Sequence, residues 1–460
     1  MKKNLINCFK KFPNRNLIYN SNLTLTYKEF YQNSLQIIES LKNIGVKKGE
    51  IILLKRENSV EYLMFLLACC LGGITVCPID PNTKNKRIQE LKKIFRINHI
   101  FDDSFVINTK KKKISENNIV LEKTKFLLMC SADKKGDTVG IVLSSDAIIK
   151  CSSSFSKLAG YNKNSRILHC LPMFYMAGIV DTFFSPLFGG SSLILNQQFS
   201  IMKINNFWSL PIKFKSNILF LTPSIIYFLC SVFKNSSKKI QEHLKKYKLI
   251  ISTGSKLNKE LNKNFFSIFN KRLSNCYGAT EFGGPISLAK NLNYVSDGGK
   301  HSKRVIIKTI NKNSKNIIHI KSDFLMDGTL SKSGFKEIKL KKNDFYEIGD
   351  YGLYKDGLLE IRGTNRKIIK RGGELIHLKY IEKKCLKLKY IKKVLAFGTE
   401  DRIAGQELYL YVEIKSNYNK KFVQNELSKF FLENFRIIEM PKKIIISKKK
   451  LSFNNIKKLI

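Results

Sequence analysis

The chain has 460 residues, which is enough for two or three domains and a large buried core. Hydrophobic residues make up 43% of it and aromatic residues 11%, which excludes a disordered or fibrous protein. The 82 Lys and Arg residues against 36 Asp and Glu give a formal net charge of +46, but only 12 of the basic residues are Arg. Nucleic-acid readers favour Arg, whose planar group pairs with phosphates and guanine edges. The lysine excess therefore indicates compositional drift and no specific nucleic-acid partner, with non-specific attraction to anions or membranes as the alternative.

The cysteines and the apolar stretches bear on the compartment. Ten cysteines are scattered from Cys8 to Cys385 without metal-ligand or disulfide-scaffold spacing, which predicts reduced, mostly buried thiols. The first residues are basic but include no apolar run of signal-peptide length. The longest apolar stretch, 63–77, is shorter than a bilayer span and is broken by two glycines. We therefore expect a cytoplasmic protein with no membrane span.

Predicted helices and strands alternate from the start of the chain. A helix over 27–44 precedes a buried strand over 50–55, and a second helix begins after Ser59 and ends at a Gly-Gly pair. The strand ITVCPID, a helix over 84–95 and the strand HIFDD follow, and the pattern recurs around ILHCLP, SSLIL, SNILFLT and KLIISTG. Strands separated by helices predict an α/β fold with mostly parallel sheets covered by helices.

The last third of the chain changes character. Between 305 and 361 the sequence has short alternating strands joined by polar turns, which predicts an antiparallel module. After Arg366 the pattern becomes helix, strand, strand, helix. The sequence thus predicts a large amino-terminal domain and a small carboxy-terminal α+β domain.

Three clusters of polar residues have residue types suited to a nucleotide. NCYGATEFGG offers an aromatic face for adenine (Tyr277), a hydroxyl for phosphate (Thr280) and a carboxylate for Mg²⁺ (Glu281). FYEIGDYG places Asp350 after a predicted strand, where it could accept hydrogen bonds from both ribose hydroxyls. The third cluster, 362–382, is a basic connector punctuated by glycines. Taken singly, each cluster also fits an ordinary polar turn or a solvated linker.

The order and spacing of YGATE, GD and IKxxGGExI resemble the adenylate-forming (AMP-binding) superfamily, which includes acyl-CoA synthetases, luciferases and peptide-synthetase adenylation domains. The segments LPMFYMAG, STGSKL and EDRIAGQELYLYVEI resemble further motifs of that superfamily. The resemblance implies that a carboxylate attacks the α-phosphate of Mg·ATP to give an acyl-adenylate. The acyl group then passes to the thiol of CoA or of a carrier protein's phosphopantetheine. The implied partners are a small carboxylate, ATP, and CoA or an acyl carrier protein.

The resemblance also implies roles for individual residues. Lys457, Thr280 and Glu281 would be catalytic, with Glu281 holding Mg²⁺, and Lys370 would act in the thioester-forming step. Tyr175 and Gly283 would border the acyl pocket. The nucleotide would be bound by Ser131, Gly254, Ser255, Tyr277, Gly278, Thr280, Asp350 and Arg362. The implied domains are 1–363, a hinge over 364–366 with Arg366 as the hinge residue, and a mobile domain over 367–460.

Several positions depart from the superfamily's pattern. The loop that should be rich in Ser, Thr and Gly for pyrophosphate reads SADKKGDTVG, in which Lys134-Lys135 replaces the usual Thr pair. The Arg expected after Gly363 is Thr364, although Arg362 and Arg366 are near in sequence. Near the carboxy terminus the superfamily's pattern has a Gly-Lys loop. The segment LSFNNIKKLI at this place contains no Gly, and Lys457 is the nearest candidate for the Lys. Two interpretations therefore stay open: an acid–thiol ligase, or a degenerate, catalytically weak homologue that binds a nucleotide, an acyl group or a partner.

Overall fold

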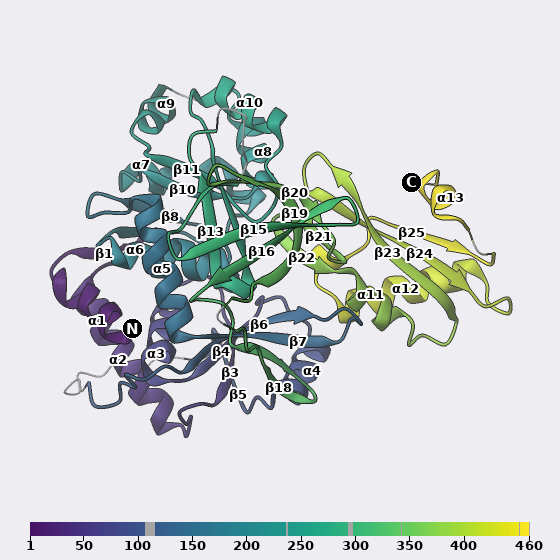
Figure 1. The fold of residues 1–460 in the computed structure, drawn as a ribbon, viewed down its shortest axis with the longest axis horizontal. Helices are drawn as coiled ribbons and strands as arrows, with labels where there is room; N and C mark the ends of the chain where they lie inside the picture. The colour runs from purple at the N-terminus through teal and green to yellow at the C-terminus, as the bar shows by residue number, and fades with distance from the viewer. Residues whose placement is uncertain (106–115, 236–237, 293–297, 342, 450, 460) are drawn as a thin grey trace.

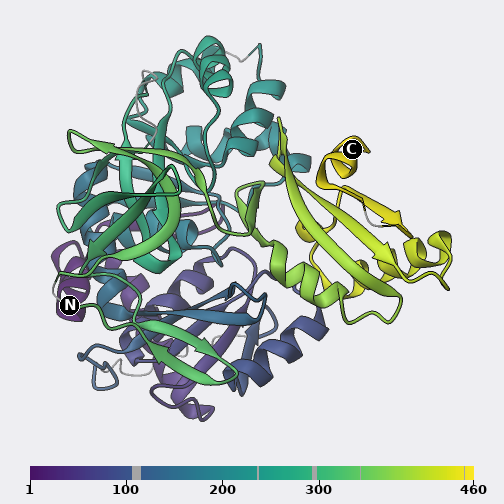
Figure 2. The same ribbon diagram turned by 45° about the vertical axis from the view of Figure 1, so that its right-hand side comes forward.

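A computed structural model describes residues 1–105, 116–235, 238–292, 298–341, 343–449 and 451–459. A large body is formed by the first four-fifths of the chain, and a smaller carboxy-terminal part lies against one side of it (Figures 1 and 2). The buried apolar residues up to Leu359 form one large core and a smaller cluster beside the second sheet. Those from Ile369 onward form separate clusters. Among the described helices, none is both long and apolar enough to cross a bilayer.

The main sheet of the body is mixed, with parallel strands at its centre and antiparallel strands towards one edge. In spatial order its described strands are β15 (Val305–Lys312), β16 (Lys315–Ser322), β19 (Tyr346–Lys355), β20 (Leu358–Thr364), β14 (Gly299–His301), β13 (Gly284–Ala289), β12 (Ser274–Ala279), β11 (Leu249–Ser252), β10 (Ile218–Leu221), β8 (Arg166–His169), β9 (Ser192–Leu195), β1 (Asn16–Tyr19) and β2 (Thr24–Thr26). The predicted antiparallel module thus extends the parallel sheet.

A second sheet lies below the first in Figure 1. Its described strands are β18 (Gly334–Glu337), β17 (Gly328–Ser331), β7 (Thr138–Ser144), β6 (Lys125–Ala132), β4 (Thr75–Pro78), β3 (Ile51–Lys55) and β5 (His99–Asp102). Strands β17 and β18 come from the predicted antiparallel module but pair with β7 in this sheet. The segment 305–361 is therefore divided between two sheets. The sequence analysis did not predict this division, because alternation of residues gives no information about which edge a strand joins.

Helices of the body cover these sheets, and their ends follow the capping signals. Helix α2 begins with a capping box between Thr26 and Glu29, and Ser59 caps α3 by accepting a hydrogen bond from the Tyr62 amide. The helices and helical turns are α1 (Lys2–Lys11), α2 (Tyr27–Asn43), α3 (Val60–Gly72), α4 (Asn85–Phe95), α5 (Ser145–Ala159), the π-helix η1 (Ala177–Phe184), α6 (Ser185–Phe188), η2 (Ile201–Asn206), α7 (Ser209–Lys213), α8 (Pro223–Val232), α9 (Lys238–Lys245), α10 (Lys259–Phe269) and η3 (Thr280–Phe282).

The carboxy-terminal part has the predicted helix-strand-strand-helix order, preceded by a hairpin that the sequence analysis did not predict. Its sheet contains β22 (Glu374–His377), β21 (Ile368–Arg371), β24 (Gly405–Ile414), β23 (Ile391–Asp401) and β25 (Lys443–Ser447). Its helices are α11 (Leu378–Cys385), α12 (Lys420–Asn434), η4 (Ile437–Glu439) and α13 (Phe453–Lys457). The chain passes from the main sheet to this sheet between Thr364 and Ile368. The proposed domain boundaries and hinge remain predictions.

Candidate active site

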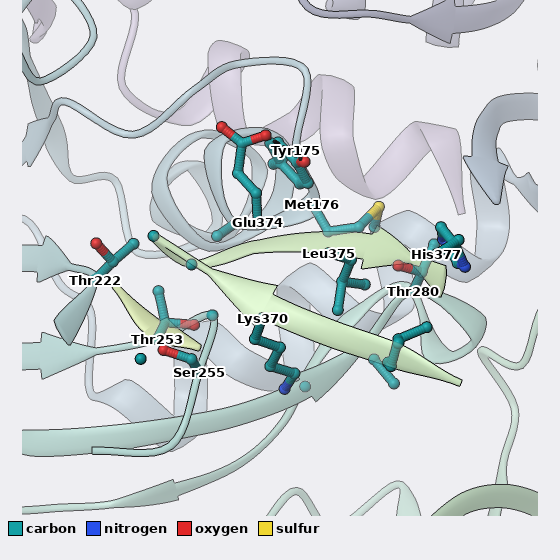
Figure 3. Close-up of a pocket in the computed structure, with 18 of the residues that line it drawn as sticks. Tyr175, Met176, Thr222, Thr253, Ser255, Thr280, Lys370, Glu374, Leu375 and His377 are labelled. Atoms are coloured by element: carbon teal, nitrogen blue, oxygen red, sulfur yellow. Dashed lines mark hydrogen bonds between the residues drawn. The ribbon is translucent and has the colours of Figure 1, made fainter. Parts of the chain in front are cut away.

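A cavity of about 1940 Å³ lies between the body and the β21–β22 hairpin (Figure 3). The strand ends and loops of the body form most of its wall, and the hairpin closes one side. Many of the residues predicted from sequence line it: Ser131, Tyr175, Gly254, Ser255, Tyr277, Gly278, Thr280, Glu281, Asp350, Arg366 and Lys370. The fold thus brings together residues that are widely separated in the sequence.

The tight connection between β12 and β13 positions Thr280 and Glu281. The chain leaves β12, forms the single turn η3 and returns through Gly283 and Gly284, both with positive φ (68° and 117°). A Cβ on Gly278 would lie 2.5 Å from the Gly284 carbonyl oxygen, so only glycine permits this close return. The Glu281 carbonyl accepts a hydrogen bond from the Met326 amide at 2.7 Å, which fixes the turn to the segment before β17.

Asp350 is a buried carboxylate with two protein partners. The Tyr277 hydroxyl donates to its Oδ2 at 2.8 Å, and the Arg366 guanidinium contacts both carboxyl oxygens at 3.0 and 3.1 Å. The same guanidinium lies 3.5 Å from Glu281. Burial, and next the charge of Asp350, raise the pKa of Tyr277 well above its usual value, so its hydroxyl remains a donor. Asp350 lies within β19, not after a strand as the sequence analysis expected.

Lys370 and Glu374 reach the cavity from the two strands of the hairpin. Burial lowers the pKa of Lys370 below its ordinary value, because an ammonium group loses hydration there. Glu374 accepts a hydrogen bond from the Tyr175 hydroxyl at 2.8 Å and pairs with Arg436 at 2.7 Å. Tyr175, predicted to border the acyl pocket, is therefore tied to the carboxy-terminal part.

The loop SADKKGDTVG forms the turn between β6 and β7 and closes on itself. The Asp133 carboxyl accepts hydrogen bonds from the amides of Lys135 and Asp137 at 2.9 and 2.8 Å. A Cβ on Gly136 would lie 2.3 Å from the Lys379 carbonyl oxygen, and Asp137 pairs with Lys383 at 2.5 Å. The loop thus packs against α11 of the carboxy-terminal part, while Ser131, Asp133 and Lys134 line the cavity.

Two predicted site residues, Arg362 and Gly283, are not among those that line the cavity. The exposed Arg362 pairs with Glu360 at 3.2 Å, and Gly283 faces α5, where a Cβ would lie 3.5 Å from Cys151. Lys457 is the last residue of α13, and its side chain lies outside the described part of the structure. Helix α13 packs through Ile456 on the carboxy-terminal sheet, away from β21 and β22 in Figures 1 and 2.

The sequence analysis missed several charged groups of the cavity wall, among them Arg436 and Asp181. Arg436 pairs with Asp80 at 3.2 Å as well as with Glu374, and it joins the strand end after β4 to η4. Asp181 lies in the π-helix η1, and it is the only charged residue between Leu171 and Phe188. An isolated charge within an apolar run is a signal that could have identified Asp181. No comparable local signal marks Arg436, whose partners are distant in sequence.

Comparisons with known proteins agree with this geometry. The family model described as AMP-binding enzyme matches residues 7–139 and 135–316. The chain is 22% identical to 2-succinylbenzoate–CoA ligase of Staphylococcus epidermidis, over 94% of this chain and 90% of that protein. It is also 22% identical to bacitracin synthase 3 of Bacillus licheniformis, over 91% of this chain but only 7% of that much longer protein.

Solved structures are similar in fold along nearly the whole chain. An o-succinylbenzoate CoA synthetase from Bacillus subtilis superposes with a TM-score of 0.82 at 18% identity, covering 98% of this chain and 96% of that one. A fused adenylation and carrier di-domain from Klebsiella oxytoca gives a TM-score of 0.79 at 18% identity, covering 99% of this chain and 95% of that one. The predicted α/β fold class is confirmed. With a family model that covers more than half of its length, the chain belongs to the AMP-binding enzyme family, as its motifs predicted.

Proposed function

We propose that this chain is an acid–thiol ligase, which activates a carboxylic acid with ATP and transfers the acyl group to a thiol. The observation that carries the proposal is the meeting, in one cavity, of the Thr280–Glu281 turn, Asp350 and Lys370. These groups come from the body and from the carboxy-terminal hairpin. Together they offer a hydroxyl, carboxylates and a cation around a space large enough for a nucleotide.

The reaction has two steps. In the first, a carboxylate oxygen attacks the α-phosphorus of ATP, the bond to pyrophosphate breaks, and an acyl-adenylate forms. In the second, a thiol sulfur attacks the acyl carbon, AMP leaves, and the thiol proton is released. Negative charge builds on the α-phosphate in the first step, so preorganised donors and cations around that phosphate lower the barrier.

Asp350 is the proposed ribose ligand, and Gly254 and Ser255 border the adenine. Because Arg366 and Tyr277 already contact the Asp350 oxygens, ribose hydroxyls share or replace these contacts when ATP binds. Arg366 is two residues from Thr364, where the family's Arg is missing. Its guanidinium, already between Asp350 and Glu281, is the proposed replacement for that cation.

Mg²⁺ fits the donor set at Glu281, because this ion takes few protein carboxylates and completes its coordination with water and phosphate oxygens. The described residues include no group of three or more His, Cys, Asp or Glu side chains that could hold a metal without the nucleotide. When bound, Mg²⁺ would neutralise charge on the phosphates. Glu281 would hold it, and Thr280 would donate its hydroxyl to phosphate.

The position of Lys370 in the cavity wall supports its proposed role in the thiol step. The acceptor is CoA or the phosphopantetheine of a carrier protein. The buried free cysteines are consistent with a reducing compartment such as the cytoplasm.

The second candidate function is a weak or inactive homologue that keeps the ligand-binding fold. The loop SADKKGDTVG favours it, because Asp133 takes up the Lys135 and Asp137 amides that could otherwise face pyrophosphate. ATP-dependent release of pyrophosphate with a panel of carboxylates separates the two candidates. Release with at least one acid is expected for a ligase, and ATP binding without release for any acid would favour the homologue.

Asp350→Asn is expected to raise the Kd for ATP by about 10- to 100-fold, because hydrogen bonds to a charged acceptor contribute about 1.5–3 kcal/mol. Calorimetric titration with ATP measures this. Asp356→Asn, in the exposed turn after the same strand, is the matched control and should leave the Kd unchanged. Equal affinity of the wild type and Asp350→Asn would remove Asp350 from the nucleotide site.

Lys370→Ala and Lys457→Ala are expected to affect different steps. Lys370→Ala should slow acyl transfer from a synthetic acyl-adenylate at least about tenfold, through loss of a cation beside the leaving AMP. Lys457→Ala should slow pyrophosphate release and spare transfer. If Lys458→Ala gives the effect assigned to Lys457, the residue is misplaced by one position; if neither does, the adenylation lysine lies elsewhere.

Arg366→Pro tests the hinge, because the proline ring fixes φ near about −65° and a hinge residue must adopt two backbone conformations. We expect pyrophosphate release to survive or fall modestly and thiol transfer to collapse. Arg366→Ala is the control, since it removes the ion pairs with Asp350 and Glu281 but leaves the backbone free. Identical effects of Pro and Ala on both steps would contradict the hinge.

A further inference from the structure

Cys77 and Cys130 form a pair of thiols beside the active-site cavity. Their Sγ atoms lie 3.6 Å apart, the one contact between two cysteine sulfurs among the described residues. Cys77 belongs to β4 and Cys130 to β6, which are neighbours in the second sheet. Both side chains pack in the apolar cluster that includes the buried residues of α4. The fold therefore holds side by side two thiols that are 53 positions apart in the chain.

The two thiols differ in their access to the cavity. All ten cysteines lie in the described part of the chain, and Cys130 is the only one of them that is not buried. Cys130 lines the cavity, whereas Cys77 is fully buried and is not among the described residues that line it. A small molecule in the cavity can therefore contact Cys130, and Cys77 lies behind it.

The surroundings of the pair favour a thiolate at Cys130. The hydrogen bond from Cys77 lowers the pKa of Cys130; burial opposes this, and the charges of Arg87 and Arg436 add to it. The pKa of Cys77 is raised well above its usual value, first by the same hydrogen bond and then by burial. A thiolate is the reactive form of cysteine, so reactivity is concentrated on the thiol that the cavity reaches.

Two other thiols in the cavity wall lack these features. Cys170 and Cys276 line the cavity but are buried. Burial raises the pKa of Cys170 to about 12, and it raises the pKa of Cys276 well above its usual value. The Cys170 thiol donates to the Phe220 carbonyl at 3.8 Å. Both thiols therefore remain protonated, and they provide an internal comparison for Cys130.

We propose that Cys77 and Cys130 form a reversible disulfide when a hydroperoxide enters the cavity, and that this disulfide weakens nucleotide binding. The Cys130 thiolate attacks one peroxide oxygen, the O–O bond breaks, and a sulfenic acid forms while the other oxygen leaves and is protonated. The Cys77 sulfur then attacks the Cys130 sulfur, the S–O bond breaks, and the hydroxyl leaves with the Cys77 proton as water. The peroxide thus accepts two electrons from the pair, and exchange with a dithiol returns them.

The consequence for the nucleotide follows from the place of Cys130 in β6. A disulfide brings the two sulfurs from 3.6 Å to about 2.0 Å, so β4 and β6 must adjust around it. Cys130 directly precedes Ser131, a cavity-lining residue that is a proposed nucleotide ligand. Ala132, the next residue, packs against the core of the carboxy-terminal part. This half of the inference rests on the proposed function, whereas disulfide formation does not.

The test of the thiol pair uses the full chain treated with hydrogen peroxide, then alkylated, digested without reduction and mapped by mass spectrometry. We expect a cross-linked Cys77–Cys130 peptide that dithiothreitol removes. Cys77→Ala should leave a Cys130 sulfenic acid that dimedone traps. Cys170→Ala is the matched control, since it removes another thiol of the cavity wall, and the Cys77–Cys130 cross-link should form in it as in the wild type.

Two results of this mapping would overturn the proposal. One is the absence of a Cys77–Cys130 cross-link under conditions in which Cys170 or Cys276 is oxidised. The other is a Cys130 sulfenic acid that persists although Cys77 is present. Both results come from the wild-type chain, so they hold even if Cys77→Ala does not fold.

Calorimetric titration with ATP tests the effect on the nucleotide. Oxidation should raise the Kd about two- to tenfold, the effect of one displaced neutral hydrogen bond, and dithiothreitol should restore it. In Cys130→Ala, peroxide should leave the Kd unchanged. An equal Kd for the reduced and the disulfide-bonded wild type would overturn the regulatory half of the inference. If the reduced protein binds no ATP, the proposed nucleotide site fails instead, and the peptide mapping alone decides whether the thiol pair is redox-active.

Discussion

A buried carboxylate must be paired and hydrogen-bonded, and in this chain that requirement acts on Asp350. The side chain is 3% exposed and lies on β19, where the main sheet forms part of the cavity wall. Its partners are Tyr277 from β12 and Arg366 from the connector to the carboxy-terminal part. Removal of Arg366 would leave a buried charge uncompensated, and removal of the Tyr277 hydroxyl would leave a carboxylate oxygen one hydrogen bond short. One carboxylate on β19 therefore links β12 to the connector between the body and the carboxy-terminal part.

Arg366 extends this link to Glu281, at 3.5 Å. The two carboxylates assigned to ribose and to Mg²⁺ thus share one guanidinium in the described state. Each ligand that arrives at the site alters the charge around the same side chain. Under the proposed roles, nucleotide binding and movement of the connector would therefore be coupled through ordinary Coulomb interactions, without a separate signalling element.

The sequence predicted most of the fold and much of the cavity wall, for reasons that differ between residues. Helix α2 and the strands β3 and β4 follow from local apolar spacing and from caps at Thr26 and Ser59, which are properties of neighbouring residues. Thr280 and Asp350 were identified because their motifs are contiguous. Arg436 and Asp80 are 356 positions apart in the chain, and their pairing depends on how the two parts dock, which local patterns do not encode. The pairing of β17 with β7 was missed for the same reason.

The two parts touch at several places through glycine. A Cβ on Gly254 would lie 3.0 Å from the Gly373 carbonyl oxygen, and one on Gly373 would lie 2.5 Å from the Thr222 side chain. Backbone meets backbone or a short side chain at these contacts, so no side chains interlock there. Ion pairs also join the two parts: Asp137–Lys383 and Lys86–Glu433 are largely in contact with solvent, whereas Arg436–Asp80 is largely buried. Salt screens the exposed pairs and water replaces them readily. Because each part keeps its own main core, separation of the two surfaces would leave both cores largely intact, and the exposed ion pairs would make it sensitive to ionic strength.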